Sequence, residues 1–319
     1  MRLLEIEGLT VSFAQAEGQV QAVRGISMTL DQGESLGIVG ESGSGKSVTC
    51  MAALRLLREP PARVAADRLS LCGVDILRAS RSDLSTIRGS AAAMIFQDPM
   101  SAFDPVFTIG HQITETIRTH RQMSASLARQ VAEALLARVE IHNPKGVLAS
   151  YPHQLSGGML QRALIAMALS CRPRVLFADE PTTALDVTVQ AQILQLIKDL
   201  QAEIGMGLVM VTHDLGVVAE TVDRVIVMYG GRIMEAAPVQ ALFDTPRHPY
   251  TRALLNSIPG QTPGKQRLSE IAGASPDPAH PPTGCPFHPR CIKAVAVCAA
   301  EMPPLVAAHD RVLACWRPE

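Results

Sequence analysis

Residues 40–47 are the part of this sequence with the most specific chemistry, because they read Gly-Glu-Ser-Gly-Ser-Gly-Lys-Ser and match the pattern G-x-x-x-x-G-K-[ST]. An apolar stretch at Leu36–Val39 predicts a strand directly before them, and a helical pattern begins at Lys46. Glycines allow a backbone to wrap around phosphate, and the start of a helix adds partial positive charge. We therefore predict that this segment, the phosphate loop, binds a nucleotide through Gly40, Glu41, Ser42, Gly43, Ser44, Gly45, Lys46 and Ser47.

Two residues of the phosphate loop have predicted roles of their own. We expect Lys46 to contact the β- and γ-phosphates and Ser47 to bind Mg²⁺.

A pair of acids follows a second apolar stretch, Val175–Ala178. In open α/β sheets, ligands bind at the carboxyl ends of the strands, which is where Asp179 and Glu180 would lie. We expect Asp179 to hold Mg²⁺ through water and Glu180 to act as the general base toward the attacking water. Such a base typically contributes about 10²–10⁴-fold to a rate.

The composition is that of a folded chain with a balanced charge. The 319 residues are 47% hydrophobic and 18% charged, with 29 Lys+Arg against 30 Asp+Glu. These values exclude disorder over the whole length and argue against a nucleic-acid binder with a strongly basic face. The longest apolar run, Ala163–Leu169, is far shorter than the roughly 18–20 residues of a membrane span. Glu5 and Glu7 interrupt any secretory signal, so we expect the chain to fold in the cytoplasm.

The elements that would position these residues alternate in type. Strands are predicted at Leu3–Ile6, Leu9–Phe13, Val20–Leu30 and Ser35–Val39, followed by a helix from Lys46 to Leu57, a strand at 91–96 and a mostly helical region. Strands at Val175–Ala178, Leu208–Thr212 and Arg224–Met228 then alternate with helices near 188–203 and 214–221. This alternation is typical of a parallel, doubly wound sheet. Residues 259–319 hold 11 of the 22 prolines, so we expect an appendage without long helices or central strands.

Further motifs make the chain resemble the ATPases of ABC transporters over about residues 1–258. Leu155-Ser156-Gly157-Gly158-Met159-Leu160-Gln161-Arg162 is similar to their signature motif, and Gln97, Ala184-Leu185-Asp186 and His213 match their Q-loop, D-loop and switch histidine. The resemblance implies a P-loop NTPase of the α/β class, with a mixed sheet, an antiparallel β subdomain and an inserted helical subdomain at about 98–170.

The resemblance also implies roles for these residues. Phe13 would stack on adenine, Gln97 would bind Mg²⁺ or the attacking water, and His213 would hydrogen-bond the γ-phosphate. Ser156, Gly157 and Gly158 open a helix, which makes them an anion site, and in the family they meet the ATP held by an opposing subunit, next to Asp186.

Three strings resemble a narrower branch, the ATP-binding subunits of dipeptide, oligopeptide and nickel importers. They are Ala93-Met94-Ile95-Phe96-Gln97-Asp98-Pro99-Met100, Tyr151-Pro152-His153-Gln154-Leu155 and Arg247-His248-Pro249-Tyr250-Thr251. The similarity is greatest to dipeptide permease subunits with a cysteine-bearing tail. It implies a paralogous ATPase subunit as a heterodimer partner, two membrane-spanning permease subunits and an external solute-binding protein, with no nucleic acid. The chain would then be a peripheral protein at the cytoplasmic face of the inner membrane.

Four of the seven cysteines, Cys285, Cys291, Cys298 and Cys315, lie in the last 35 residues with the spacing C-x5-C-x6-C-x16-C. In a reducing compartment such a group favours a metal site over disulfides. The spacing fits zinc ribbons poorly, whereas four thiolates can hold a [4Fe–4S] cluster, which the resembling permease tail carries. Zinc and unligated thiols remain alternatives, and His288 is a further candidate ligand or an exposed loop residue.

We expect an ATPase that powers import of di- or oligopeptides across the bacterial inner membrane. One alternative is the same role in a nickel or other small-solute importer. A soluble ABC ATPase of DNA repair or translation is a more distant one. A redox- or iron-sensing role of the cysteine tail is also open.

Overall fold

The computed structural model describes residues 1–16, 18–182, 185–257 and 271–319, and its contacts divide the chain into two compact units. The first unit comprises Met1, residues 31–33 and residues 78–209. The second comprises residues 2–30, 34–77 and 210–319. The strand β9 (Gly207–Thr212), which is buried throughout, runs across the division of the chain between Val209 and Met210.

The second unit contains an antiparallel sheet built from the N-terminal strands. Its order is β2-β1-β5-β6, and β4 also pairs with β1. The strands are β1 (Arg2–Gln15), β2 (Gly18–Asp31), β4 (Ala62–Ala65), β5 (Arg68–Leu71) and β6 (Val74–Asp75). The register pairs Leu4 with Leu71 and Phe13 with Ala62. Apolar residues recur at alternate positions of β1, such as Leu9 and Val11, and are fully buried, as expected for a sheet with one covered face.

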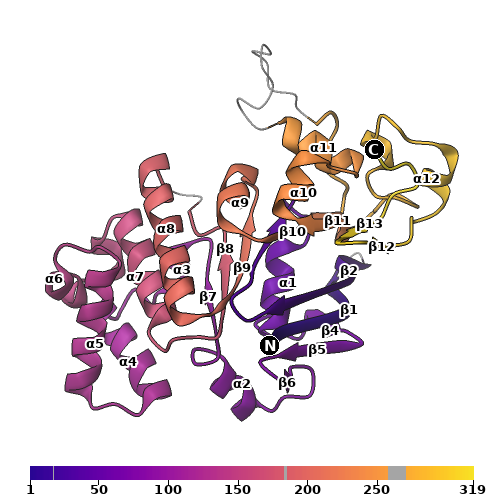
Figure 1. Cartoon of the computed structure of the whole chain (residues 1–319). Coiled ribbons are helices and arrows are strands. Elements are labelled where there is room, and N and C mark those ends of the chain that lie inside the picture. The colour runs from indigo at the N-terminus through magenta and orange to yellow at the C-terminus, as the bar shows by residue number, and fades with distance from the viewer. Residues whose placement is uncertain (17, 183–184, 258–270) are drawn as a thin grey trace. The chain divides into compact units, whose positions relative to one another are not determined.

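A mixed arrangement of strands in the same unit positions the phosphate loop (Figure 1). β3 (Ser35–Val39) pairs in parallel with β10 (Arg224–Tyr229), which pairs antiparallel with β11 (Arg232–Pro238). All residues of β3 are buried: Leu36–Val39 lack polar side chains, and the Ser35 hydroxyl donates to Asp223 Oδ2 at 2.6 Å. Helix α1 (Lys46–Ala53) follows β3 across the loop. The unit also contains α9 (Leu215–Thr221), α10 (Val239–Asp244) and α11 (Pro249–Asn256).

The described part of the C-terminal extension, residues 271–319, packs onto this second unit. It contains η2 (His288–Arg290), α12 (Ala296–Ala300), β12 (Val306–Ala308) and β13 (Arg311–Leu313). β13 lies between β11 and β12, with Leu313 opposite Glu235. The ring of Phe287 packs against those of Tyr229 and Tyr250, and its centroid lies 5.3 Å from that of Tyr229 and 5.1 Å from that of Tyr250. The extension is therefore held by an aromatic cluster and by strand pairing.

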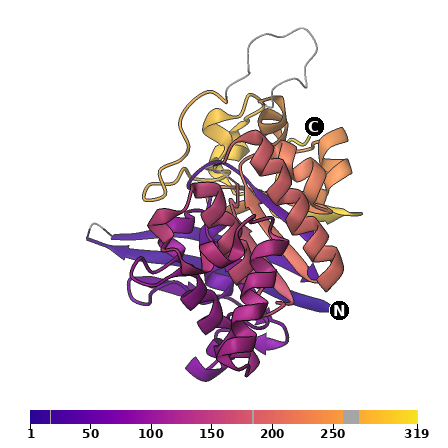
Figure 2. The ribbon, with the colours of Figure 1, turned by 90° about the vertical axis from the view of Figure 1, so that its left-hand side faces the viewer.

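The first unit holds the helical region, where most helices begin at a side-chain cap. Its helices are α2 (Arg81–Ile87), α3 (Pro99–Ala102), α4 (Ile109–Arg121), α5 (Ala125–Arg138), α6 (Pro144–Ala149), η1 (Pro152–Gln154), α7 (Gly157–Leu169) and α8 (Val187–Ile204). Asn143 caps α6 with Pro144 in the first position, as predicted. α4 packs against α5, α6 and α7, which gather in one cluster (Figure 2). In the same unit, β7 (Ala92–Ile95) pairs in parallel with the fully buried β8 (Val175–Asp179).

Three sequence predictions differ from the structure. The two predicted N-terminal strands form one continuous strand, β1. Gly8, which lies between them, tolerates the φ of +62° found there, and its N–H donates to Ser27 Oγ at 3.0 Å. The helix expected to run to Leu57 ends at Ala53. Two residues later, Arg55 adopts a φ of +50°, which is not helical. The proline-rich tail does contribute a strand with two neighbours, β13, since its three residues contain no proline.

The predicted domain boundary between residues 258 and 259 lies outside the described residues. Among the helices of the described ranges, none combines the length and the apolar character needed to cross a membrane.

Candidate functional site

The phosphate loop of the second unit is the sharp turn that the sequence predicts between β3 and α1. Gly45 precedes α1 with a φ of +97°, and no side chain caps this end of the helix. Lys46 is buried, and its Nζ donates hydrogen bonds to the carbonyl oxygens of Gly40 (2.8 Å) and Glu41 (3.0 Å). The lysine charge is thus held against the loop at the N-terminal end of α1, where the helix dipole also favours anions.

Two glycines of the loop have no room for a side chain. A Cβ on Gly40 would lie 2.2 Å from the carbonyl oxygen of Met228, and a Cβ on Gly45 would lie 2.6 Å from that of Ala22. Both residues also have a positive φ. The glycines that the motif requires are therefore explained by close backbone contacts as well as by conformation.

Glu41 is bonded to two segments far away in the sequence. Its N–H donates to the hydroxyl of Tyr250 at 3.0 Å, and its carboxylate accepts from Arg290 Nη1 at 2.7 Å. Burial raises the pKa of Tyr250, so this hydroxyl stays protonated. Sequence reasoning missed Tyr250 and Arg290 as neighbours of the loop, because their separation from Glu41, 209 and 249 residues, leaves no local signal.

The predicted acid pair ends β8 in the first unit. Asp179 is the last, buried residue of the strand. Glu180 follows with a φ of +46°, a conformation that costs a non-glycine residue energy and is often found at functional sites. Gln97 Nε2 donates to Glu180 Oε2 at 2.9 Å. The structure thus brings together two of the three predicted catalytic residues, from positions 83 residues apart.

The signature motif in the first unit has the local structure predicted from its sequence. Ser156 is the N-cap of α7, and its Oγ accepts from the N–H of Met159 at 3.4 Å. Met159 is exposed, whereas Leu160 is buried within the helix packing. Gly157 is exposed and Gly158 is half-buried, so the start of α7 is accessible to an anion.

One further residue of the signature motif was not predicted to be functional. The buried Gln161 of α7 donates from Nε2 to the carbonyl oxygen of Pro181 at 2.7 Å. This bond joins the signature helix to the turn that contains Glu180.

The remaining predicted residues are placed as follows. Asp186 accepts from the N–H of Val189 at 3.1 Å and caps α8, while Ala184 of the same motif lies outside the described residues. In the second unit, the exposed His213 follows β9, and Phe13 is half-buried near the end of β1. Their predicted nucleotide contacts remain predictions.

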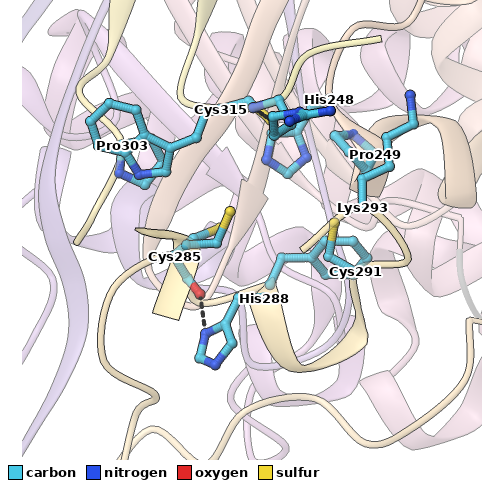
Figure 3. A pocket seen from close by; sticks show the side chains of 12 residues that line it. His248, Pro249, Cys285, His288, Cys291, Lys293, Pro303 and Cys315 are labelled. Atoms are coloured by element: carbon cyan, nitrogen blue, oxygen red, sulfur yellow. Dashed lines mark hydrogen bonds between the residues drawn. The ribbon is translucent and has the colours of Figure 1, made fainter. Parts of the chain in front are cut away.

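The four clustered cysteines line one cavity of the extension (Figure 3). Cys285 and Cys298 are buried, whereas Cys291 and Cys315 are partly exposed. His288 also lines the cavity, but its Nδ1 is bonded to the carbonyl oxygen of Cys285 at 2.9 Å. In the described ranges, no set of three or more His, Cys, Asp and Glu side chains is arranged to hold a metal ion. The described residues therefore form no ready-made metal site of the kind expected from the sequence, although the four thiols share one cavity.

Three thiols of this cavity, those of Cys285, Cys291 and Cys315, have an environment that favours their protonated form. Burial, together with the nearby Cys315, Cys298 and Cys291, raises the pKa of Cys285 to about 11. Burial also raises the pKa of Cys291 and Cys315. A metal that binds here must displace protons, so its binding weakens as the pH falls.

A buried histidine lies beside the same cavity. His248 caps α11 by accepting from the N–H of Tyr250 at 3.0 Å, and burial lowers its pKa to about 4. The imidazole is therefore neutral at physiological pH.

Two family descriptions match the chain. Residues 23–183 match the family described as ABC transporter, and residues 234–298 match the oligopeptide/dipeptide transporter C-terminal region. The first match contains the phosphate loop, the signature motif and the acid pair. The second contains three of the four clustered cysteines.

Individual proteins are similar over nearly the whole chain. A probable peptide ABC transporter ATP-binding protein of Sinorhizobium fredii is 49% identical, covering 99% of this chain and 95% of its own length. The dipeptide transport ATP-binding protein DppD of Escherichia coli is 47% identical, covering 100% and 97%. The oligopeptide transport ATP-binding protein OppD of Bacillus subtilis is 46% identical, covering 97% and 87%.

A solved structure is similar as well. It is a dimeric ATP-binding cassette in a post-hydrolysis state with ADP and Pi, 28% identical with a TM-score of 0.65, and the match covers 74% of this chain and 98% of that one.

Proposed function

Because the chain belongs to the ABC transporter ATPases and carries the C-terminal region of the oligopeptide/dipeptide transporters, we propose that it hydrolyses ATP to drive the import of di- or oligopeptides across a membrane. The observation that carries this function is the similarity to peptide-transport ATP-binding proteins at 46–49% identity, which includes the extension as well as the ATPase part. A nickel or other small-solute importer is the alternative from the sequence. The names of these relatives favour peptides.

We assign the nucleotide contacts to the predicted residues. The phosphate loop binds the phosphates, with Lys46 on the β- and γ-phosphates, and Phe13 stacks on adenine. Ser47, Gln97 and Asp179 supply hydroxyl, amide and carboxylate oxygens, a donor set that suits Mg²⁺. When bound, Mg²⁺ neutralises phosphate charge.

Hydrolysis is assigned to three side chains. Glu180 takes a proton from the attacking water, and Gln97, already bonded to Glu180, orients that carboxylate. His213 donates a hydrogen bond to the γ-phosphate, where negative charge increases in the transition state.

The partners follow from the same family. The start of α7 (Ser156, Gly157 and Gly158) and Asp186 face the ATP of a second, paralogous ATPase subunit, and the dimeric cassette among the similar structures supports such a pairing. Two permease subunits and an external solute-binding protein complete the importer, which holds this chain at the cytoplasmic face of the membrane.

Uptake by cells tests this function. Cells that lack this chain should lose uptake of labelled di- and oligopeptides and regain it when the wild-type chain is supplied. Loss of nickel uptake alone would replace the peptide proposal by the nickel alternative. Unchanged uptake of both would contradict a transport role.

We also propose that Cys285, Cys291, Cys298 and Cys315 hold a [4Fe–4S] cluster. Two observations support it: the four thiols share one cavity, and Phe287, Pro303 and Trp316 give this cavity apolar walls. The binding free energy of such a group becomes folding free energy, which would suit a small proline-rich segment.

Metal analysis of anaerobically purified protein tests the cluster. We expect about four iron and four sulfide per chain, with visible absorbance that is lost in Cys285→Ser. Cys171→Ser is the control, since this thiol lies outside the cavity and bonds to the carbonyl oxygen of Thr116. Stoichiometric zinc, or protein without metal, would contradict the proposal.

A further inference from the structure

Arg290 joins the cysteine segment to the phosphate loop. It is the last residue of η2 and directly precedes Cys291. Its side chain is only 8% exposed, and Nη1 donates to Glu41 Oε2 at 2.7 Å and to the Tyr229 hydroxyl at 3.0 Å. Nε and Nη2 donate to the carbonyl oxygens of Ala272 (2.9 Å) and Ile271 (3.0 Å). All three guanidinium nitrogens are thus used, which fixes the plane of the group.

Glu41, the partner of Arg290, is fixed at its side chain and along its backbone. Its carboxylate, 21% exposed, also accepts from the Ser275 hydroxyl, which belongs to the extension. Its N–H is bonded to Tyr250, and its carbonyl oxygen accepts from Lys46 Nζ at 3.0 Å and from the N–H of Ser44 at 3.2 Å. A change at the carboxylate is therefore transmitted to the backbone that contacts Lys46.

The charge of Glu41 needs compensation in a loop that binds an anion. Like charges repel, and the effect is strong where solvent is partly excluded. Removing one partner of a buried ion pair leaves the other charge uncompensated. Without Arg290, the carboxylate would stand unneutralised beside the phosphates.

We propose that Arg290 is a positioning residue for nucleotide binding: it neutralises Glu41 and holds the first turn of the phosphate loop, so that the conformation of the cysteine segment determines the affinity for ATP. The proposal rests on the assignment of residues 40–47 as the nucleotide site. It requires no cluster, because Arg290 and Glu41 both belong to the second unit and contact each other directly.

Arg290→Ala should raise the Kd of the purified full chain for MgATP roughly tenfold, measured with a fluorescent ATP analogue. In the assembled transporter, KM for ATP should rise more than kcat falls. Because the effect acts through the charge of Glu41, the double variant Glu41→Gln/Arg290→Ala should bind MgATP more tightly than Arg290→Ala alone. Arg290→Lys should give an intermediate affinity, since it keeps the charge but loses the planar set of donors.

Arg311→Ala is the matched control. Arg311 also joins the extension to the rest of the unit through a buried acid, Glu235, but it does not contact the phosphate loop. This variant should lower thermal stability and leave the Kd for MgATP unchanged. An equal loss of affinity in Arg311→Ala and Arg290→Ala would show general loosening of the extension and would overturn the positioning role.

Lys46→Met separates this proposal from the one on which it rests. If Lys46→Met binds MgATP normally, the phosphate-loop assignment is wrong. If Lys46→Met loses affinity while Arg290→Ala binds as the wild type does, only the positioning role of Arg290 is overturned.

Discussion

Replacing Glu180 with Gln is expected to lower ATP hydrolysis by the assembled transporter at least about 100-fold while MgATP still binds. The change removes the base but keeps the shape of the side chain. The amide oxygen of the introduced glutamine can still accept the hydrogen bond from Gln97 Nε2, which measures 2.9 Å in the wild type. The measurements are phosphate release at saturating ATP and nucleotide affinity by titration.

The control for this variant is the same substitution on an exposed carboxylate. Glu203 is 45% exposed and pairs with Arg138 at the surface, so Glu203→Gln should leave hydrolysis unchanged. Hydrolysis by Glu180→Gln within a few fold of the wild-type rate would contradict the general-base assignment. Such a result would mean that another group near the end of β8 acts as the general base.

The residues of the site that the sequence predicts well are those with short-range causes. The positive φ angles of the phosphate-loop glycines, the Ser156 cap of α7 and the position of Asp179 at the end of β8 depend on neighbours within a few residues. Each of these features is a backbone conformation, a cap or a strand end, and local sequence contains the signal for all three.

The features that the sequence does not predict depend on contacts between distant segments. Helix α1 ends early where Arg55 turns back and donates to the carbonyl oxygens of Ile76 and Leu77, both at 3.3 Å. The helix propensity of residues 46–57 does not predict this contact, because propensity depends only on local sequence. The ion pair of Arg290 and Glu41 spans a still larger sequence separation. From the sequence alone, an arginine in a proline-rich tail is expected to be solvent-exposed, and only the fold shows that it contacts the phosphate loop.

The composition of the C-terminal extension predicts its secondary structure only in part. Its prolines do exclude long helices, as expected, but Val306–Ala308 and Arg311–Leu313 contain none and form β12 and β13. The extension gains its order by adding to an existing strand, β11, and by packing Phe287 on Tyr229 and Tyr250. A segment with too little apolar mass for a core of its own thus shares the core of the unit that carries the phosphate loop.

The second large effect is expected for Lys46→Met, which should raise the Kd for MgATP at least about tenfold and lower hydrolysis accordingly. Lys46 Nζ is bonded to the carbonyl oxygens of Gly40 and Glu41, so the charge already lies inside the loop that would bind the phosphates. Methionine keeps the buried stem and removes only the ammonium group, which limits the damage to folding. Titration with a fluorescent ATP analogue measures the affinity, and thermal unfolding checks that the variant is folded.

Lys145→Ala is the control for Lys46→Met, because Lys145 is 79% exposed and its pairing with Glu133, at 3.9 Å, is a surface contact. It should bind MgATP as the wild type does. No second positive side chain of the phosphate loop can replace Lys46, since the other residues from Gly40 to Ser47 are glycines, serines and one glutamate. A folded Lys46→Met variant with unchanged affinity for MgATP would therefore contradict the assignment of residues 40–47 as the nucleotide site.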